Sequence, residues 1–232
     1  IIYYKLNKNL KLDKNFIKKK IYNIKNIKLF VKIHNMGFYK NDKTLLKILK
    51  LNKIFILEDL AQSCSTQNIK INKFDYGKSF YLFSLNKILP VTDGAFLTSN
   101  NSDIVNTINL KKRLKPNYKS ISYYSKHINN NNKIADSLSI SRVRNYINKS
   151  NEYYDKYYKL IKNDFALREI STNTLNILLR IDMNNLFKQR IENYDFLVSQ
   201  IKSSKFQLLK DTNSSIAPMA LPLIVKGSRL KL

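Results

Sequence analysis

The sequence predicts an α/β fold in which a mostly parallel β-sheet comes first and helices follow. Three observations indicate this. A strand, a helix and a second strand follow one another within about 30 residues. Two more strand patterns come next, and after residue 99 the hydrophobic spacing changes to that of helices. Parallel sheets are usually buried on both faces, so we expect the sheet to hold the core.

The first three elements form a βαβ unit. Residues 28–33 and 54–57 are short β-branched or aromatic runs bounded by polar residues, which is typical of strands. Between them, residues 42–51 place leucine and isoleucine at helical spacing, and Asn41 or Asp42 can cap this helix. Crossovers between parallel strands are almost always right-handed, so both strands should lie in one sheet.

Two further strands, then helices, then one edge strand complete the predicted order. Residues 78–84 and 95–98 are the strands. Four helices follow: 103–114, 135 to about 170, 175–181 and 186–201. Residues 182–185 are expected to form a break between the last two helices, and the polar run N-N-N-N at 129–132 is expected to be a loop. Residues 217–225, with a proline near their start, are expected to form an edge strand.

We expect two parts, residues 1–125 with the sheet and residues 126–232 with a helical segment and the start of a small C-terminal domain. The single Cys64 cannot close an internal disulfide, which indicates a reducing compartment and hence the cytoplasm. Two histidines and one cysteine offer no zinc set, and no apolar run approaches the roughly 20 residues of a membrane span. The first residue is not methionine, so we expect a fragment of a longer product.

The net charge of +26 would ordinarily indicate nucleic acid or an anionic membrane as partner. Composition favours another explanation. The chain has 35 lysines, 30 asparagines and 28 isoleucines but only seven arginines, and codons for the three abundant residues are AT-rich. The lysines are dispersed, with Lys18 to Lys20 as the longest run, and no nucleic-acid motif accompanies them. A solvated lysine surface is the favoured interpretation, and nucleic-acid binding is the alternative that net charge alone supports.

Two short segments carry the residues that pyridoxal phosphate chemistry requires. Asp59 lies in E-D-L-A-Q at 58–62, at the end of a predicted strand, where ligands of open α/β sheets bind. Lys87 lies in S-L-N-K-I-L-P-V-T-D-G at 84–94. Such an enzyme needs one carboxylate at the pyridine nitrogen and one lysine that binds the cofactor covalently. Taken alone, Asp59 could be a helix cap or a surface charge, and Lys87 is one of many lysines.

With these segments the chain resembles the DegT/StrS family of pyridoxal-phosphate-dependent sugar aminotransferases, which have the fold type I aminotransferase architecture. The family motif E-D-x-A-Q matches residues 58–62. The lysine segment S-L-R-K-x-L-P-V-x-D-G-G of some members matches residues 84–95, except that Asn86 replaces arginine and Ala95 replaces the second glycine.

Three other segments extend the resemblance along the chain. H-N-M-G-F at 34–38 is similar to the family's H-x-x-G-F turn, and R-I-E-N-Y at 190–194 is similar to its R-x-x-N-Y helix. A-P-M-A-L-P at 217–222 also has a counterpart. The matches follow the family's order over essentially the whole chain.

The resemblance implies a role for each matched residue. Asp59 would pair with the protonated pyridine nitrogen, and Lys87 would bind the cofactor and shift a proton between it and the substrate. Gln62 would hydrogen-bond the cofactor's phenolic oxygen, or else be an ordinary residue at a helix start. Ser84 would contact the phosphate, or else be an ordinary strand-end serine. His34 would line the cofactor pocket, or else be a buried structural histidine.

The resemblance also implies a reaction and an assembly. The enzyme would transfer an amino group, with glutamate as the expected donor, to a nucleotide-linked keto sugar in amino-sugar and surface-polysaccharide biosynthesis, and it would be a homodimer. Lysine at position 87 favours transamination, because relatives that dehydrate sugars have histidine there. Only the family's central portion is matched, so the sheet would be incomplete at its N-terminus. A truncated, catalytically inactive fragment is therefore the rival interpretation.

Overall fold

The computed structural model describes residues 1–7, 10–24, 26–38, 42–63, 79–99, 101–109, 112–201, 206–209 and 219–225. The chain divides into two compact units. The first, the sheet unit, comprises Ile1–Ile88, Ala95–Asn106 and Asp182–Leu232. The second, the helical unit, comprises Leu89–Gly94 and Thr107–Ile181.

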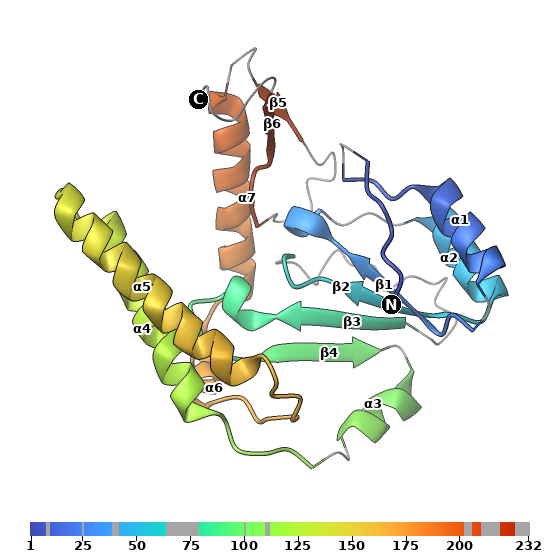
Figure 1. Ribbon diagram of the computed structural model, residues 1–232, viewed down its shortest axis with the longest axis horizontal. Helices are drawn as coiled ribbons and strands as arrows, with labels where there is room; N and C mark the ends of the chain where they lie inside the picture. The colour runs from blue at the N-terminus through green and yellow to red at the C-terminus, as the bar shows by residue number, and fades with distance from the viewer. Residues whose placement is uncertain are drawn as a thin grey trace. The chain divides into compact units, whose positions relative to one another are not determined.

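Four strands form the main sheet of the sheet unit, in the order β1 (Leu29–Ile33), β2 (Phe55–Asp59), β3 (Ser79–Ser84) and β4 (Ala95–Ser99). Strands β1, β2 and β3 are parallel, and β4 runs antiparallel to β3 (Figure 1). The predicted α/β class and the mostly parallel sheet are thus confirmed. Short 3₁₀ turns follow two of the strands, η1 (Asn35–Gly37) after β1 and η2 (Leu85–Lys87) after β3.

The predicted βαβ unit is present, with helix α2 (Lys43–Leu51) between β1 and β2. Asp42 caps α2, because its side chain accepts a hydrogen bond from Leu45 N at 3.1 Å. An additional helix, α1 (Lys14–Asn23), was not predicted, because four lysines and two asparagines interrupt its apolar residues.

Helices α1 and α2 pack on the same face of the sheet. Their buried side chains form one cluster with the start of β2: Ile17, Ile21, Leu45, Ile48, Leu49, Ile54 and Ile56. Side chains alternate between the faces of a strand, so Glu58 lies on the same face as Ile56, and Asp59 lies on the other. On that other face Val31 and Leu97 remain exposed. The two faces therefore present different environments at the end of β2.

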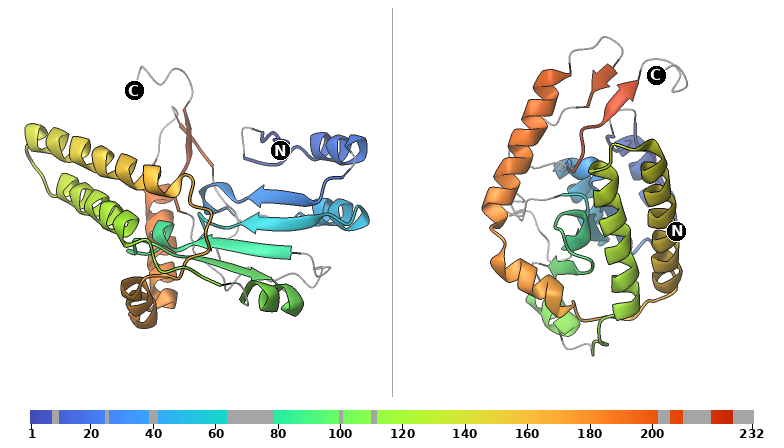
Figure 2. Two further views of the ribbon diagram at one scale, coloured as in Figure 1. Left: turned by 60° about the horizontal axis from the view of Figure 1, so that its bottom comes forward. Right: turned by 90° about the vertical axis from the view of Figure 1, so that its left-hand side faces the viewer.

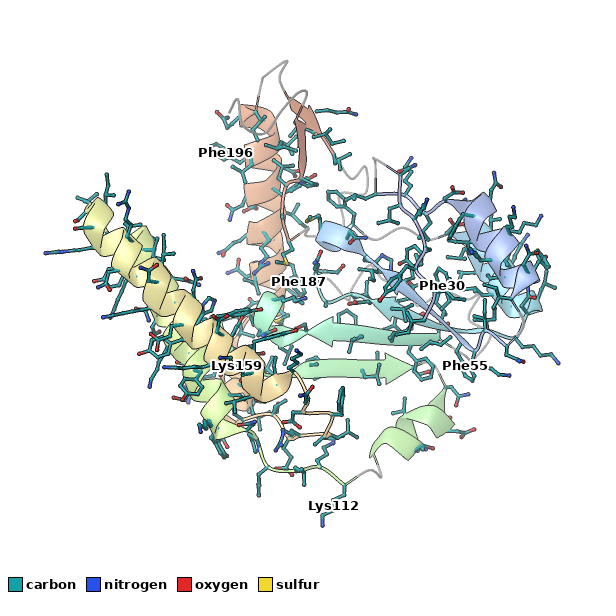
Figure 3. The ribbon with its side chains drawn as sticks, viewed as in Figure 1. Phe30, Phe55, Lys112, Lys159, Phe187 and Phe196 are labelled. Carbon is teal, nitrogen blue, oxygen red and sulfur yellow. The ribbon has the colours of Figure 1, made fainter. Side chains whose placement is uncertain are left out.

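Helix α7 (Met183–Gln200) and a two-stranded antiparallel sheet of β5 (Phe206–Leu208) and β6 (Leu223–Val225) complete the sheet unit. Phe187 on α7 is buried, whereas Phe196 is exposed (Figure 3). The predicted helix 186–201 is confirmed, although it begins three residues earlier. Strand β5 was not predicted. Of the described residues 219–225 in the predicted edge strand, the last three form a strand, and Pro218, near the predicted start, lies outside the described residues.

Asp182 explains the early start of α7. Its Oδ1 accepts hydrogen bonds from Asn184 N and Asn185 N, both at 3.0 Å, so the predicted break at 182–185 is in fact a cap and a first turn. We expect Asp182→Ala to lower the free energy of unfolding by about 1 kcal/mol, measured by urea titration. Asp182→Asn keeps an acceptor and should cost much less. Equal losses in both variants would contradict the capping role.

The helical unit contains an antiparallel pair, α4 (Tyr118–Ala135) and α5 (Ile140–Ile161), which lie side by side in both views of Figure 2. The prediction that residues 129–132 form a loop is wrong, because these asparagines lie inside α4. The predicted helix from 135 to about 170 is shorter at both ends. Helix α3 (Ser102–Asn109) also ends before the predicted residue 114, and α6 (Thr172–Arg180) matches its prediction closely.

Packing against α5 explains why the asparagine run is helical. Tyr124 of α4 contacts Tyr157 of α5 with ring centroids 4.8 Å apart. Nearer the asparagines, the buried Ser150 Oγ donates to Asn131 Oδ1 at 2.6 Å and lies 2.8 Å from His127 Nδ1. Asparagine has only modest helix propensity, and tertiary packing of this kind overrides it.

The lysines lie mostly on the surface, as Lys112 and Lys159 illustrate (Figure 3). None of the helices that the structure describes is long and apolar enough to cross a bilayer. Cys64, on which the compartment prediction rests, lies outside the described ranges.

Candidate active site

The predicted site residues of the sheet unit gather at one edge of the main sheet, where the parallel strands β1, β2 and β3 all end. His34 follows β1, Asp59 ends β2 and Ser84 ends β3. Backbone hydrogen bonds hold these ends together, from His34 N to Asp59 O at 3.0 Å and from Leu60 N to Leu82 O at 2.8 Å. Ligands of open α/β sheets bind at this edge.

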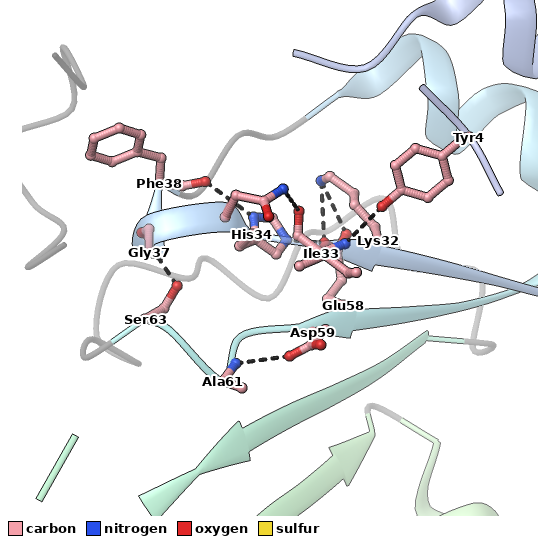
Figure 4. A network of polar contacts seen from close by, with 11 residues as sticks. Tyr4, Lys32, Ile33, His34, Gly37, Phe38, Glu58, Asp59, Ala61 and Ser63 are labelled. Atoms are coloured by element: carbon pink, nitrogen blue, oxygen red, sulfur yellow. Dashed lines mark hydrogen bonds and ion pairs between the residues drawn. The ribbon is translucent and has the colours of Figure 1, made fainter. Parts of the chain in front are cut away.

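Asp59 and Ser84 lie on the same face of the sheet. Asp59 is paired in register with Leu82, and Ser84 is two residues further along β3. Because side chains alternate, both point to the face that α1 and α2 do not cover. Asp59 Oδ1 accepts a hydrogen bond from Ala61 N at 3.0 Å, which fixes the orientation of the carboxylate (Figure 4).

Lys87 is the last residue of η2, directly after β3, and its side chain is exposed. The backbone on both sides of it is anchored. Before it, Ser84 Oγ donates to Asn86 Oδ1 at 2.7 Å, and after it, Arg190 Nη2 from α7 donates to Ile88 O at 2.6 Å. The lysine is thus an accessible amine on a held turn.

Gln62 holds the turn that follows β1. Its Oε1 accepts a hydrogen bond from Met36 N at 2.6 Å, and Ser63 Oγ donates to Gly37 O at 3.3 Å. Met219 N donates to Met36 O at 3.0 Å from the far end of the chain. Met36 has φ 59°, a left-handed conformation that costs a non-glycine residue about 1 kcal/mol, so these contacts stabilise a strained turn.

A buried cluster of three ionisable side chains lies behind the strand ends: Lys32, His34 and Glu58, which are 5%, 2% and 4% exposed (Figure 4). Lys32 and Glu58 are register partners on β1 and β2, and Lys32 Nζ lies 3.2 Å from Glu58 Oε2. His34 Nε2 hydrogen-bonds the same Oε2, and His34 Nδ1 lies 3.4 Å from Phe38 O. One carboxylate therefore serves two nitrogen groups.

Opposing effects act on the pKa of Glu58. Burial raises it, but the hydrogen bond from His34 and the positive charge of Lys32 lower it, and the net result is a pKa below the ordinary value of 4.5. Glu58 is therefore ionised at neutral pH. An ionised carboxylate can only accept, so Nε2 of His34 is the donor in its hydrogen bond with Glu58.

Lys32 and Glu58 were not predicted as site residues. A signal was present, because Lys32 interrupts an apolar run and Glu58 follows one, and charged residues inside a buried strand pattern are rare unless paired. Their pairing could be inferred only from the strand register. His34 is buried and bonded to Glu58, which lies on the face opposite to Asp59.

Asp93, in the second half of the lysine segment, belongs to the helical unit. It accepts hydrogen bonds from Ser171 N and Ser171 Oγ, both at 2.7 Å, and from the buried Thr174 hydroxyl. Ser171 caps α6, so Asp93 secures the start of that helix. This contact is structural and leaves Asp93 outside the candidate site.

Two cavities lie near β1. One, of about 560 Å³, is largely apolar and follows residues 1–4, α1 and β1. The other, of about 340 Å³, reaches Lys32 and His34 at the end of β1. Asp59 and Lys87 are not among the described residues that line either cavity.

The strand ends offer a fixed carboxylate and a hydroxyl on one face, a buried ion cluster on the other, and an accessible amine on the turn after β3. Comparison of the sequence with protein-family models gives no match, and comparison with curated proteins gives none either.

Proposed function

We propose that this chain is part of a pyridoxal-phosphate-dependent aminotransferase of fold type I. In this proposal it transfers an amino group, with glutamate as the expected donor, to a nucleotide-linked keto sugar. One observation carries the proposal. Asp59 and Ser84 lie on the same face at the ends of adjacent parallel strands, and Lys87 follows on a turn three residues later.

The residues at this edge fit the cofactor. A carboxylate, a hydroxyl and an amine are the groups that a pyridine nitrogen, a phosphate and an aldehyde respectively require. Asp59 is held by Ala61 N through Oδ1 alone, so the carboxylate can accept a further hydrogen bond through its second oxygen. When bound, pyridoxal phosphate supplies an electron sink for the carbon that carries the amino group.

The chain's own residues would then divide the work. The Asp59 carboxylate would keep a proton on the ring nitrogen by charge pairing. The Lys87 amine would hold the cofactor and afterwards carry a proton to and from the substrate carbon, for which an exposed amine on a fixed turn is well placed. Ser84 would donate its hydroxyl to the phosphate in exchange for its bond to Asn86.

Two predicted roles receive less support. Gln62 Oε1 is occupied by Met36 N, so only its amide nitrogen could reach the cofactor's phenolic oxygen. His34 is bonded to Glu58 and Phe38, which favours support of the site over contact with the cofactor. We therefore propose Lys87, Asp59 and Ser84 as the cofactor residues, and Gln62 as a residue that holds the neighbouring turn.

Covalent trapping tests the proposal. The protein is incubated with pyridoxal phosphate, reduced with borohydride and mapped by peptide mass spectrometry. We expect the pyridoxyl group on Lys87, and we expect Lys87→Arg to abolish the visible absorbance of the bound cofactor. Lys47→Arg is the matched control, because Lys47 is an exposed lysine of the same unit on α2.

A label on another lysine, with Lys87 unmodified, would refute the assignment. Equal labelling of many exposed lysines would also refute it, since the chain has 35 of them to react without selectivity. Glutamate-dependent amination of a nucleotide-linked keto sugar is the corresponding test of the reaction.

A further inference from the structure

The cavity of about 340 Å³ at the end of β1 has a markedly cationic lining. Lys11, Lys14 and Lys32 contribute ammonium groups and His34 contributes its ring. Its volume lies at the lower end of the range for small-molecule sites, and its position matches the edge at which α/β sheets bind ligands.

The carboxylates near this cavity are already engaged. Asp42 is the one acidic residue among the described residues of its lining, and its Oδ1 accepts from Leu45 N at 3.1 Å and pairs with Lys14 Nζ at 3.2 Å. Glu58, behind the cavity wall, is shared between Lys32 and His34. Cationic groups therefore outnumber the carboxylates that face them.

Two helices begin at the cavity. Lys14, the first residue of α1, and Asp42, the cap of α2, both line it, and the carboxylates of Asp13 and Asp42 cap the two helix starts. Asparagine amides from Asn7 and Asn35 and the leucines Leu6, Leu10 and Leu12 complete the wall, which suits an uncharged polar body attached to an anionic group.

We propose that this cavity binds the phosphate group of a small phosphorylated ligand. The phosphate would lie among the ammonium groups of Lys11, Lys14 and Lys32 and accept hydrogen bonds from them. This site is separate from Asp59 and Lys87, and its occupation requires no cofactor.

Isothermal titration calorimetry tests the inference. The protein is titrated with inorganic phosphate, a hexose phosphate and a nucleoside diphosphate in about 150 mM NaCl, which screens nonspecific electrostatic attraction. We expect one saturable site. Lys11→Ala and Lys14→Ala should each weaken binding about tenfold, the effect of losing one charge-assisted contact. Lys18→Ala and Lys19→Ala remove the same charge from exposed positions of α1 outside the cavity and should change the affinity little.

Histidine resonances give a second readout, because the chain has only two histidines. The ring signals of His34 should move on saturation, while those of His127 on α4 should not. The ligand that binds tightest identifies whether a free phosphate, a sugar or a nucleotide is the source. Three outcomes would overturn the proposal. The affinity could fall equally in all four lysine variants, none of the three probes could show saturable binding, or the ring signals of both histidines could shift equally.

Discussion

Replacing Glu58 by glutamine is expected to lower the free energy of unfolding by about 3 to 5 kcal/mol, measured by urea titration at neutral pH. The substitution keeps the side-chain volume but removes the one carboxylate that Lys32 and His34 share. Both would remain almost fully buried, and an unpaired buried charge is among the most destabilising changes in a protein core.

Two control variants separate charge from packing. Glu192→Gln breaks the exposed pair of Lys188 and Glu192 on α7, whose nearest atoms are 3.9 Å apart, and should cost no more than about 0.5 kcal/mol. Lys32→Met combined with Glu58→Leu removes both partners and should recover much of the lost stability. A loss below about 1 kcal/mol for Glu58→Gln would show that the cluster is not the buried ion pair described above.

The pH dependence of stability provides an independent check. The pKa of Glu58 is lower in the folded protein than its ordinary value of 4.5, so the unfolded chain binds the proton more readily. Its contribution is therefore fully present above pH 4.5 and is lost as the pH falls from there through the lowered pKa. The difference in stability between the wild-type protein and Glu58→Gln should shrink over that acidic range.

Asp59→Asn is expected to reduce turnover on the order of 100-fold or more while weakening cofactor binding far less. The amide can still accept the hydrogen bond from Ala61 N, so the strand end should keep its shape. It cannot stabilise a protonated ring nitrogen by charge, so the electron sink weakens. Steady-state amination rates, with cofactor affinity from absorbance titration, measure the two effects separately.

Asp182→Asn is a matched control for this variant, since it replaces a capping carboxylate of the same unit outside the strand ends and outside the cavities at β1. It should leave turnover near normal. A near-normal rate in Asp59→Asn would exclude the role proposed for Asp59, and equal loss of rate in both variants would attribute the effect to stability.

Local patterns predicted the sheet unit well. The βαβ unit could be predicted because β1 and β2 are short apolar runs, α2 has leucine and isoleucine at helical spacing, and Asp42 is a good cap. Helix α1 and strand β5 were missed because their sequences are polar or short. The loop predicted at residues 129–132 was wrong because contacts such as Ser150 to Asn131 lie 19 residues apart and cannot be deduced from the asparagine run itself.

Some residues of the candidate site could likewise be predicted from the sequence, and others could not. Asp59, Ser84 and Lys87 lie in short motifs and could be predicted as candidates from the sequence alone. Lys32 and Glu58 are 26 residues apart, and their contact depends on the pairing of β1 with β2. A shift of one residue in that register would place Lys32 beside a residue of the opposite face, so no composition or spacing argument reveals the pair.

The segments that carry the family resemblance contact one another through groups other than the Lys87 amine. The turn at Met36 and Gly37 is held by Gln62, Ser63 and Met219, Phe38 packs edge-on against Tyr194 of α7, and Arg190 binds the carbonyl oxygen of Ile88. None of these contacts involves the side chain of Lys87, so a substitution there would leave the segments in place. The described fold of these segments therefore does not depend on an amine at position 87, and the same backbone arrangement could persist in a protein that has lost the proposed reaction.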